Sequence, residues 1–80
     1  MTLVEKLEAE LRRLEMVKSE ALENEGIGHF DEFRKKPSPR GENFDQWINA
    51  ETQRLTVESL LATAKAVEMK FEAYEKVKAV

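Results

Sequence analysis

Eighty residues without cysteine limit this chain to one small domain that has neither disulfide bonds nor thiolate metal sites. The single histidine excludes a histidine-rich metal site within one subunit, and a net charge of −3 argues against a surface that binds nucleic acid throughout. Because a core of this size rarely supplies more than about 3–5 kcal/mol, the fold needs very regular helix packing or self-association.

Residues 2–24 form the first predicted helix. Thr2 and Glu5 have the spacing of a capping box, in which each side chain satisfies a free backbone N–H of the other residue. Gly26 predicts the end of this helix, because glycine adopts the left-handed conformation that closes a helix. Between these ends, apolar residues recur at helical spacing at Val4, Leu7, Leu11, Leu14, Val17 and Ala21.

The middle of the chain, residues 26–42, contains all three glycines and both prolines and is predicted to be a loop or a short helical turn. Four of the six aromatic residues of the chain lie in or beside it: Phe30, Phe33, Phe44 and Trp47. Such a cluster has two interpretations, a small core that pins the loop and an interaction surface at the tip, since aromatic residues are favoured interface anchors.

The same loop is rich in cations, at Arg34, Lys35, Lys36 and Arg40. One hypothesis is a nucleic-acid-binding module in which these residues contact phosphates. The simpler interpretation is a solvated turn whose cations pair with nearby carboxylates. His29, Asp31 and Glu32 form a small polar group, but without a second histidine or a nucleophile beside them we predict no catalytic residue, metal ligand or cofactor.

Residues 43–78 form the second predicted helix, which contains no glycine or proline. Asn43 with Gln46 repeats the capping-box spacing at its start. Six apolar residues then step by three and four along the helix, in the heptad pattern of a coiled coil. This predicted seam comprises Val57, Leu60, Ala64, Val67, Phe71 and Tyr74.

The two predicted helices differ in length, at roughly 34 Å and roughly 54 Å for 1.5 Å per residue. If the loop folds the second helix back along the first, the residues beyond about Val67 have no partner within the chain. Phe71 and Tyr74 would then be exposed, and monomers rarely expose a contiguous apolar stripe.

The predicted fold is therefore all-α, an antiparallel helical hairpin that completes a helical bundle by self-association, with a homodimer favoured. The predicted function is a non-enzymatic protein-protein interaction module that acts as an adaptor, inhibitor or assembly factor. A second possibility is that the free end of the long helix fits the groove of a different protein. No apolar run is long enough to span a bilayer and acidic residues lie near Met1, so we expect a cytoplasmic protein without membrane contact.

Overall fold

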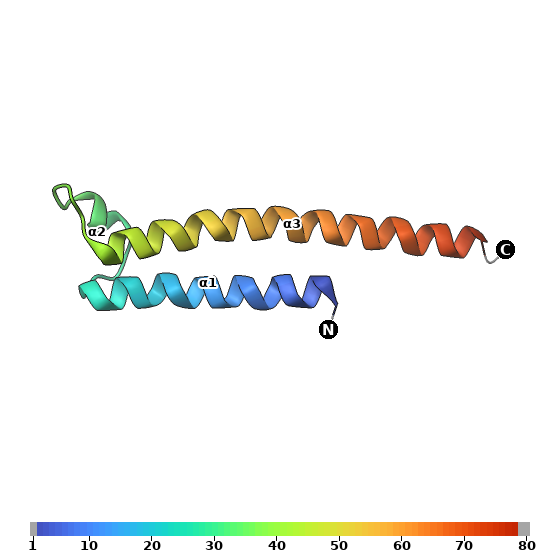
Figure 1. Cartoon of the computed structure of the whole chain (residues 1–80), viewed down its shortest axis with the longest axis horizontal. Helices are drawn as coiled ribbons and strands as arrows, with labels where there is room; N and C mark the ends of the chain where they lie inside the picture. The colour runs from blue at the N-terminus through green and yellow to red at the C-terminus, as the bar shows by residue number, and fades with distance from the viewer. Residues whose placement is uncertain (1, 79–80) are drawn as a thin grey trace.

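A computed structural model describes residues 2–78, and within them the chain is all-α, as predicted. The helices are α1 (Leu3–Glu25), α2 (Asp31–Arg34) and α3 (Glu42–Lys78), and no strand occurs between residues 2 and 78. Figure 1 shows α1 and α3 lying side by side and running in opposite directions, with α2 at the end where they are joined. The region for which a loop or a short turn is predicted thus contains one helical turn, and α3 is a single continuous helix.

The molecule is long and thin. Its principal dimensions are 63 × 20 × 16 Å and its radius of gyration is 18.2 Å, whereas a compact domain of this length would have a radius of about 12 Å. The reason is the difference in length between α1, with 23 residues, and α3, with 37. The last turns of α3 project beyond the start of α1 (Figure 1), and we call residues 69–77 the overhang.

Both ends of α1 follow the predicted signals. The backbone N–H of Glu5 donates to Oγ1 of Thr2 at 3.1 Å, although the Glu5 carboxylate accepts from the Thr2 hydroxyl rather than capping a backbone group. Gly26 has φ +68° in the left-handed region, and the N–H of Ile27 donates to the carbonyl of Leu22 at 3.1 Å. These are the bonds of a glycine-closed helix end, for which a side chain at Gly26 would be strained.

The prediction that Asn43 and Gln46 cap the second helix is wrong. The helix begins one residue earlier, at Glu42, so Asn43 already lies within its first turn. Both side chains instead contact α1 or its end: Nδ2 of Asn43 donates to Glu25 at 3.1 Å, and Nε2 of Gln46 donates to the Val17 carbonyl at 3.1 Å. Bonding across the two helices has replaced the local bonds that the spacing favoured.

Five buried apolar residues make up the core of the described chain: Leu14, Ala21, Phe33, Ala50 and Leu61. Two are alanines, so α1 and α3 approach closely but remove little apolar surface from water. On α3 it is Leu61 that faces α1, at 9% exposure, while its neighbour Leu60 is 53% exposed. A single pair of helices with so few buried side chains is a marginal core, since burying one large apolar side chain stabilises by only about 1.5–3 kcal/mol.

Candidate self-association surface

An apolar groove of about 350 Å³ lies where the start of α1 meets the second half of α3. Leu3 and Leu7 form one wall, and the other wall is built by α3. Leu3 is 60% exposed and Val67 is 59% exposed, so the groove is open to solvent. The α3 residues that line it are Leu60, Thr63, Ala64, Val67 and Glu68.

Beyond this groove the apolar surface continues along the overhang. Phe71 is 59% exposed, Tyr74 is 61% exposed and Val77 is 77% exposed, because α1 ends before it could cover them. Large apolar side chains that are scattered singly on a surface need no explanation, but these join the groove into one stripe along a single side of α3.

The structure divides the predicted seam into two parts. Val57 and Ala64 are half-buried beside α1, whereas the other four residues are exposed: Leu60, Val67, Phe71 and Tyr74. Sequence reasoning missed that Leu3 and Leu7 of α1 extend this surface. Their signal was present in the apolar spacing of the first helix, which continues to Leu3 although Leu3 remains 60% exposed.

The middle of the molecule is held by ion pairs between α1 and α3. Nζ of Lys18 lies 2.5 Å from a Glu51 oxygen and 4.8 Å from the centre of the Trp47 ring. Arg54 bonds to Glu51 within α3 and lies 3.6 Å from Glu15 of α1. The hydrogen bond from Arg54, reinforced by Lys18, lowers the pKa of Glu51 to about 2. Lys18 and Glu51 are each about four-fifths covered, so this pair orients α3 relative to α1, whereas Glu15 is 58% exposed.

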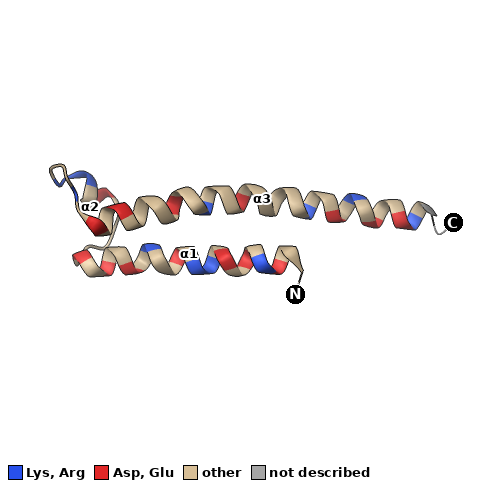
Figure 2. Ribbon diagram, in the orientation of Figure 1, with Lys and Arg blue, Asp and Glu red and all other residues tan. Residues whose placement is uncertain are grey.

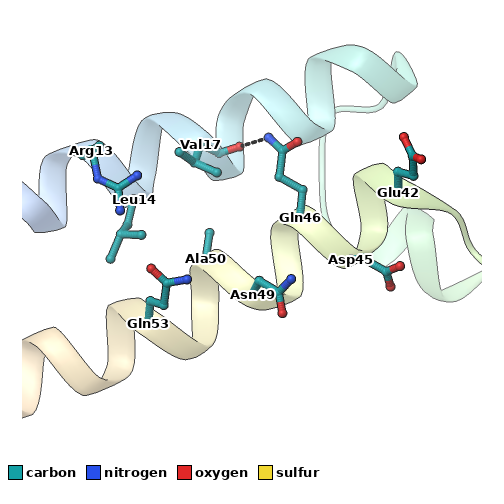
Figure 3. Close-up of a pocket in the computed structure, with 9 residues that line it drawn as sticks. All are labelled: Arg13, Leu14, Val17, Glu42, Asp45, Gln46, Asn49, Ala50 and Gln53. Atoms are coloured by element: carbon teal, nitrogen blue, oxygen red, sulfur yellow. Dashed lines mark hydrogen bonds between the residues drawn. The ribbon is translucent and has the colours of Figure 1, made fainter.

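A second cavity, of about 400 Å³, lies over the middle of the same helix pair and is drawn in Figure 3. Gln46 reaches from α3 to the Val17 carbonyl, while Asp45 and Asn49 point away from α1. Arg13 is paired with Glu10 on its own helix. The cavity brings together no nucleophile with a base, so its polar groups have the geometry of helix packing rather than of an acid–base site.

At the joined end, the four predicted aromatic residues do come together. Phe30 stacks on Trp47 with ring centres 3.8 Å apart, and Phe33 contacts the edge of Phe44 at 5.6 Å. Phe33 is fully buried and Trp47 is half-buried. The cluster is thus packed internally and holds α2 against the start of α3.

The predicted phosphate-contacting residues lie around this cluster, and three of them have partners in the chain. Lys36 is 2.6 Å from Glu25, and that bond together with Asn43 lowers the pKa of Glu25. Arg40 donates to the Lys36 carbonyl at 3.2 Å and lies over the Phe44 ring. Arg34 lies 3.8 Å from Asp31, which leaves Lys35 as the one of these four cations that has no ion pair, side-chain hydrogen bond or ring contact within residues 2–78.

His29 has a structural role in the loop. Its Nδ1 accepts a hydrogen bond of 3.1 Å from the backbone N–H of Asp31, the first residue of α2. The same Nδ1 lies 3.5 Å from an oxygen of the Asp31 carboxylate. Within residues 2–78, no group of three or more His, Cys, Asp or Glu side chains is arranged to hold a metal ion.

Comparison with family models, with curated proteins and with solved structures finds no match to this chain. Along the described residues, no helix combines the length and the apolar character needed to cross a bilayer.

Proposed function

We propose that this chain is a non-enzymatic protein-interaction module, a helical hairpin that self-associates through the seam and so completes a helical bundle. We assign the seam to contact with a second copy of the chain. The observation that carries the proposal is the continuity of the apolar groove with the exposed overhang. Leu3 and Leu7 open it at one end, and Phe71 and Tyr74 extend it at the other.

The size of the core supports this assignment. Five buried apolar side chains, two of them alanine, cannot stabilise 80 residues by much. Disulfide bonds are excluded because the chain contains no cysteine. A second copy that covers the seam would roughly repeat the burial that α1 supplies to the neighbouring face of α3, which is how small helical chains commonly reach stability.

The charges beside the seam favour a second copy of the chain as the partner, rather than a strongly charged protein. Lys70 lies on one edge of the seam, while Glu68 and Glu75 lie on the other. In a parallel pair of helices, the lysine on one edge of one copy faces the glutamate five residues further along the opposite edge of the other copy. Lys70 therefore meets Glu75 of the second copy, and the surface is complementary to itself.

Nucleic-acid binding by the tip has less support. Arg34, Lys36 and Arg40 contact a carboxylate, a ring or a carbonyl of their own chain. A phosphate would compete with these contacts, and Glu25 lies beside Lys36. Binding to generic DNA that weakens steeply with salt would favour this alternative, because each phosphate contact releases a counterion.

The proposal is tested with the double variant Phe71→Glu and Tyr74→Glu, compared by light scattering coupled to gel filtration. We expect the assembly mass of the natural chain to fall in the variant, while circular dichroism keeps its helical signal. Met16→Glu is the matched control, since Met16 is 64% exposed on α1 and lies outside the seam. Equal masses for the natural chain and the seam variant would remove the proposal.

A further inference from the structure

A second surface of α3, distinct from the seam, faces away from α1. Its residues step alternately by four and three along the helix, and every one of them is exposed. At about 100° per residue, Leu55 lies roughly 160° around α3 from Val57, which is beside α1. We call these residues the back stripe: Ile48, Thr52, Leu55, Ser59, Ala62, Ala66, Met69 and Ala73.

The back stripe carries no charge. Between Ile48 and Met69 the charged residues of α3 all lie toward α1 or at the edge of that interface, at Glu51, Arg54, Glu58, Lys65 and Glu68. Figure 2 shows the contrast between the largely tan middle of α3 and the alternating red and blue of α1. A solvated helix face normally carries charge, so an uncharged one, with Leu55 56% exposed and Met69 70% exposed, has the composition of a contact surface.

Three threonine hydroxyl groups on or beside the back stripe are already satisfied within the helix. Oγ1 of Thr52 donates to the Ile48 carbonyl at 2.9 Å, Thr56 donates to the carbonyl of Thr52, and Thr63 donates to the carbonyl of Ser59. Burial of these threonines would leave none of their hydroxyl donors without an acceptor, and such a donor is the main cost of burying a polar group. The threonines therefore present their methyl groups outward. The Ser59 hydroxyl has no such bond within residues 2–78 and needs an acceptor from the second copy.

We infer that the back stripe packs against the back stripe of a second copy, with the two α3 helices antiparallel. Large residues then lie opposite small ones throughout, as close packing requires. Leu55 lies opposite Ala66 of the second copy, and Ile48 lies opposite its Ala73. Met69 faces Thr52, and Ser59 faces Ala62 at the centre of the pair.

The fit of large residues to small ones favours this orientation, and one flanking ion pair agrees with it. In the antiparallel register, Glu58 lies beside Lys65 of the second copy, and the two-fold symmetry produces this pair twice. The same register brings Glu51 beside Glu72 of the second copy, but Glu51 is already paired with Lys18 and Arg54 of its own chain. In a parallel arrangement, Lys65 would lie beside Lys70 of the second copy. Each residue of the back stripe would then face its own equivalent, so that Leu55 would contact Leu55 and Ala62 would contact Ala62. Like charges and unequal layers both disfavour that alternative.

Two contact surfaces on one chain imply an assembly of more than two copies. The seam and the back stripe lie on different sides of α3, so each can contact a different copy at the same time. Because each surface is complementary to itself, removal of one should leave dimers that depend on the other.

The first test compares solution masses in a two-by-two set of variants. The seam variant is Phe71→Glu with Tyr74→Glu, and the back variant is Leu55→Glu with Ala66→Glu. We expect the natural chain to exceed the dimer mass, each variant alone to form dimers and the combined variant to be monomeric. Met16→Glu should behave like the natural chain.

These masses separate the two proposals. A back variant with the mass of the natural chain overturns the back-stripe interface whatever the seam variant does. A seam variant with the mass of the natural chain, combined with a monomeric back variant, overturns the seam and supports the back stripe. A natural chain that never exceeds the dimer mass contradicts the use of both surfaces.

The second test uses the absence of native cysteine to measure orientation. Leu55→Cys and Ala66→Cys chains are oxidised separately and as a mixture. We expect cross-linked dimers in the mixture at many times the yield of either chain alone. Efficient cross-linking of Leu55→Cys with itself would overturn the antiparallel arrangement. Glu20→Cys, on the exposed side of α1, measures the background of random encounters.

Discussion

The two ends of α3 differ in how far the chain itself completes their packing. At the joined end, Phe33 is fully buried, Trp47 is stacked on Phe30, and Lys36 is paired with Glu25. At the free end, Phe71 and Tyr74 are about three-fifths exposed. Apolar residues occur along the whole length of α3. Those at the joined end are covered by their own chain, whereas those at the free end are exposed to solvent.

Exposure, rather than apolar composition, is therefore what distinguishes the proposed contact region of α3 from its joined end. The aromatic cluster at the joined end has the composition of a recognition surface, yet its rings contact one another. The free end has fewer aromatic residues, but nothing in the described chain covers them.

Phe33→Ala tests whether the joined end is a core. Removal of a fully buried phenylalanine ring should lower the free energy of unfolding by about 3–5 kcal/mol, because it removes apolar burial and leaves a cavity. Urea denaturation measures this loss. Phe71→Ala, measured at concentrations where assemblies dissociate, should change the unfolding free energy by much less. Equal losses for the two variants would contradict the division between the two ends.

Leu61→Ala and Leu60→Ala form a matched pair of neighbours. Leu61 faces α1, and its truncation should cost about 2–5 kcal/mol even in the isolated chain. Leu60 is 53% exposed, and its truncation should cost only about 0.5 kcal/mol in the isolated chain. At concentrations where the chain self-associates, the Leu60 variant should become markedly less stable than the natural chain. A Leu60 effect that is the same at all concentrations would argue against the seam.

Gly26→Ala tests the turn that ends α1. Its φ of +68° is unfavourable for a residue with a Cβ atom, so the variant should lose about 1–2 kcal/mol of unfolding free energy. Gly28→Ala is the control, since Gly28 has no positive φ and its added Cβ would meet no atom within 4 Å. If both variants unfold at the same urea concentration, the left-handed turn does not contribute to stability.

Acid should weaken the ion pairs between α1 and α3. Because Arg54 and Lys18 lower the pKa of Glu51 from 4.5 to about 2 in the folded chain, the carboxylate contributes stability above about pH 4.5. This contribution is lost as the pH falls from 4.5 toward 2, since the unfolded chain takes up the proton first. Glu51→Gln should cost about 1 kcal/mol at pH 7 and reduce the pH dependence.

Urea midpoints measured from pH 7 to pH 2.5 follow this effect. Glu23→Gln serves as control, because Glu23 is exposed on α1 and has no ion pair with any described residue. An unchanged slope in the Glu51 variant would mean that other carboxylates, such as Glu25 beside Lys36, account for the acid sensitivity.

Local sequence signals were enough to predict both long helices and the end of α1 at Gly26. The face that α3 turns toward α1 was not predictable in the same way. Two heptads share Val57 and Ala64, one continuing through Leu60 and the other through Leu61, and these two leucines lie about 100° apart around the helix. Periodicity alone cannot choose between them.

The choice depends on contacts between residues distant in sequence. Lys18 and Glu51 resemble charges of a solvated face, yet they bond to each other across the two helices. Gln46 has the spacing of a cap and instead bonds to Val17. The back stripe was overlooked for a related reason, since Thr52 looks polar until the bond from its hydroxyl to the Ile48 carbonyl is known.

If the open end of α3 is covered by a second copy of the chain, as we propose, the solution mass of the natural protein will show it. Light scattering coupled to gel filtration, over a tenfold concentration range, should give a mass well above the 9.3 kDa of one chain. This mass should decrease at the lowest concentrations as the copies dissociate. A folded monomer of 9.3 kDa at every concentration would contradict the account.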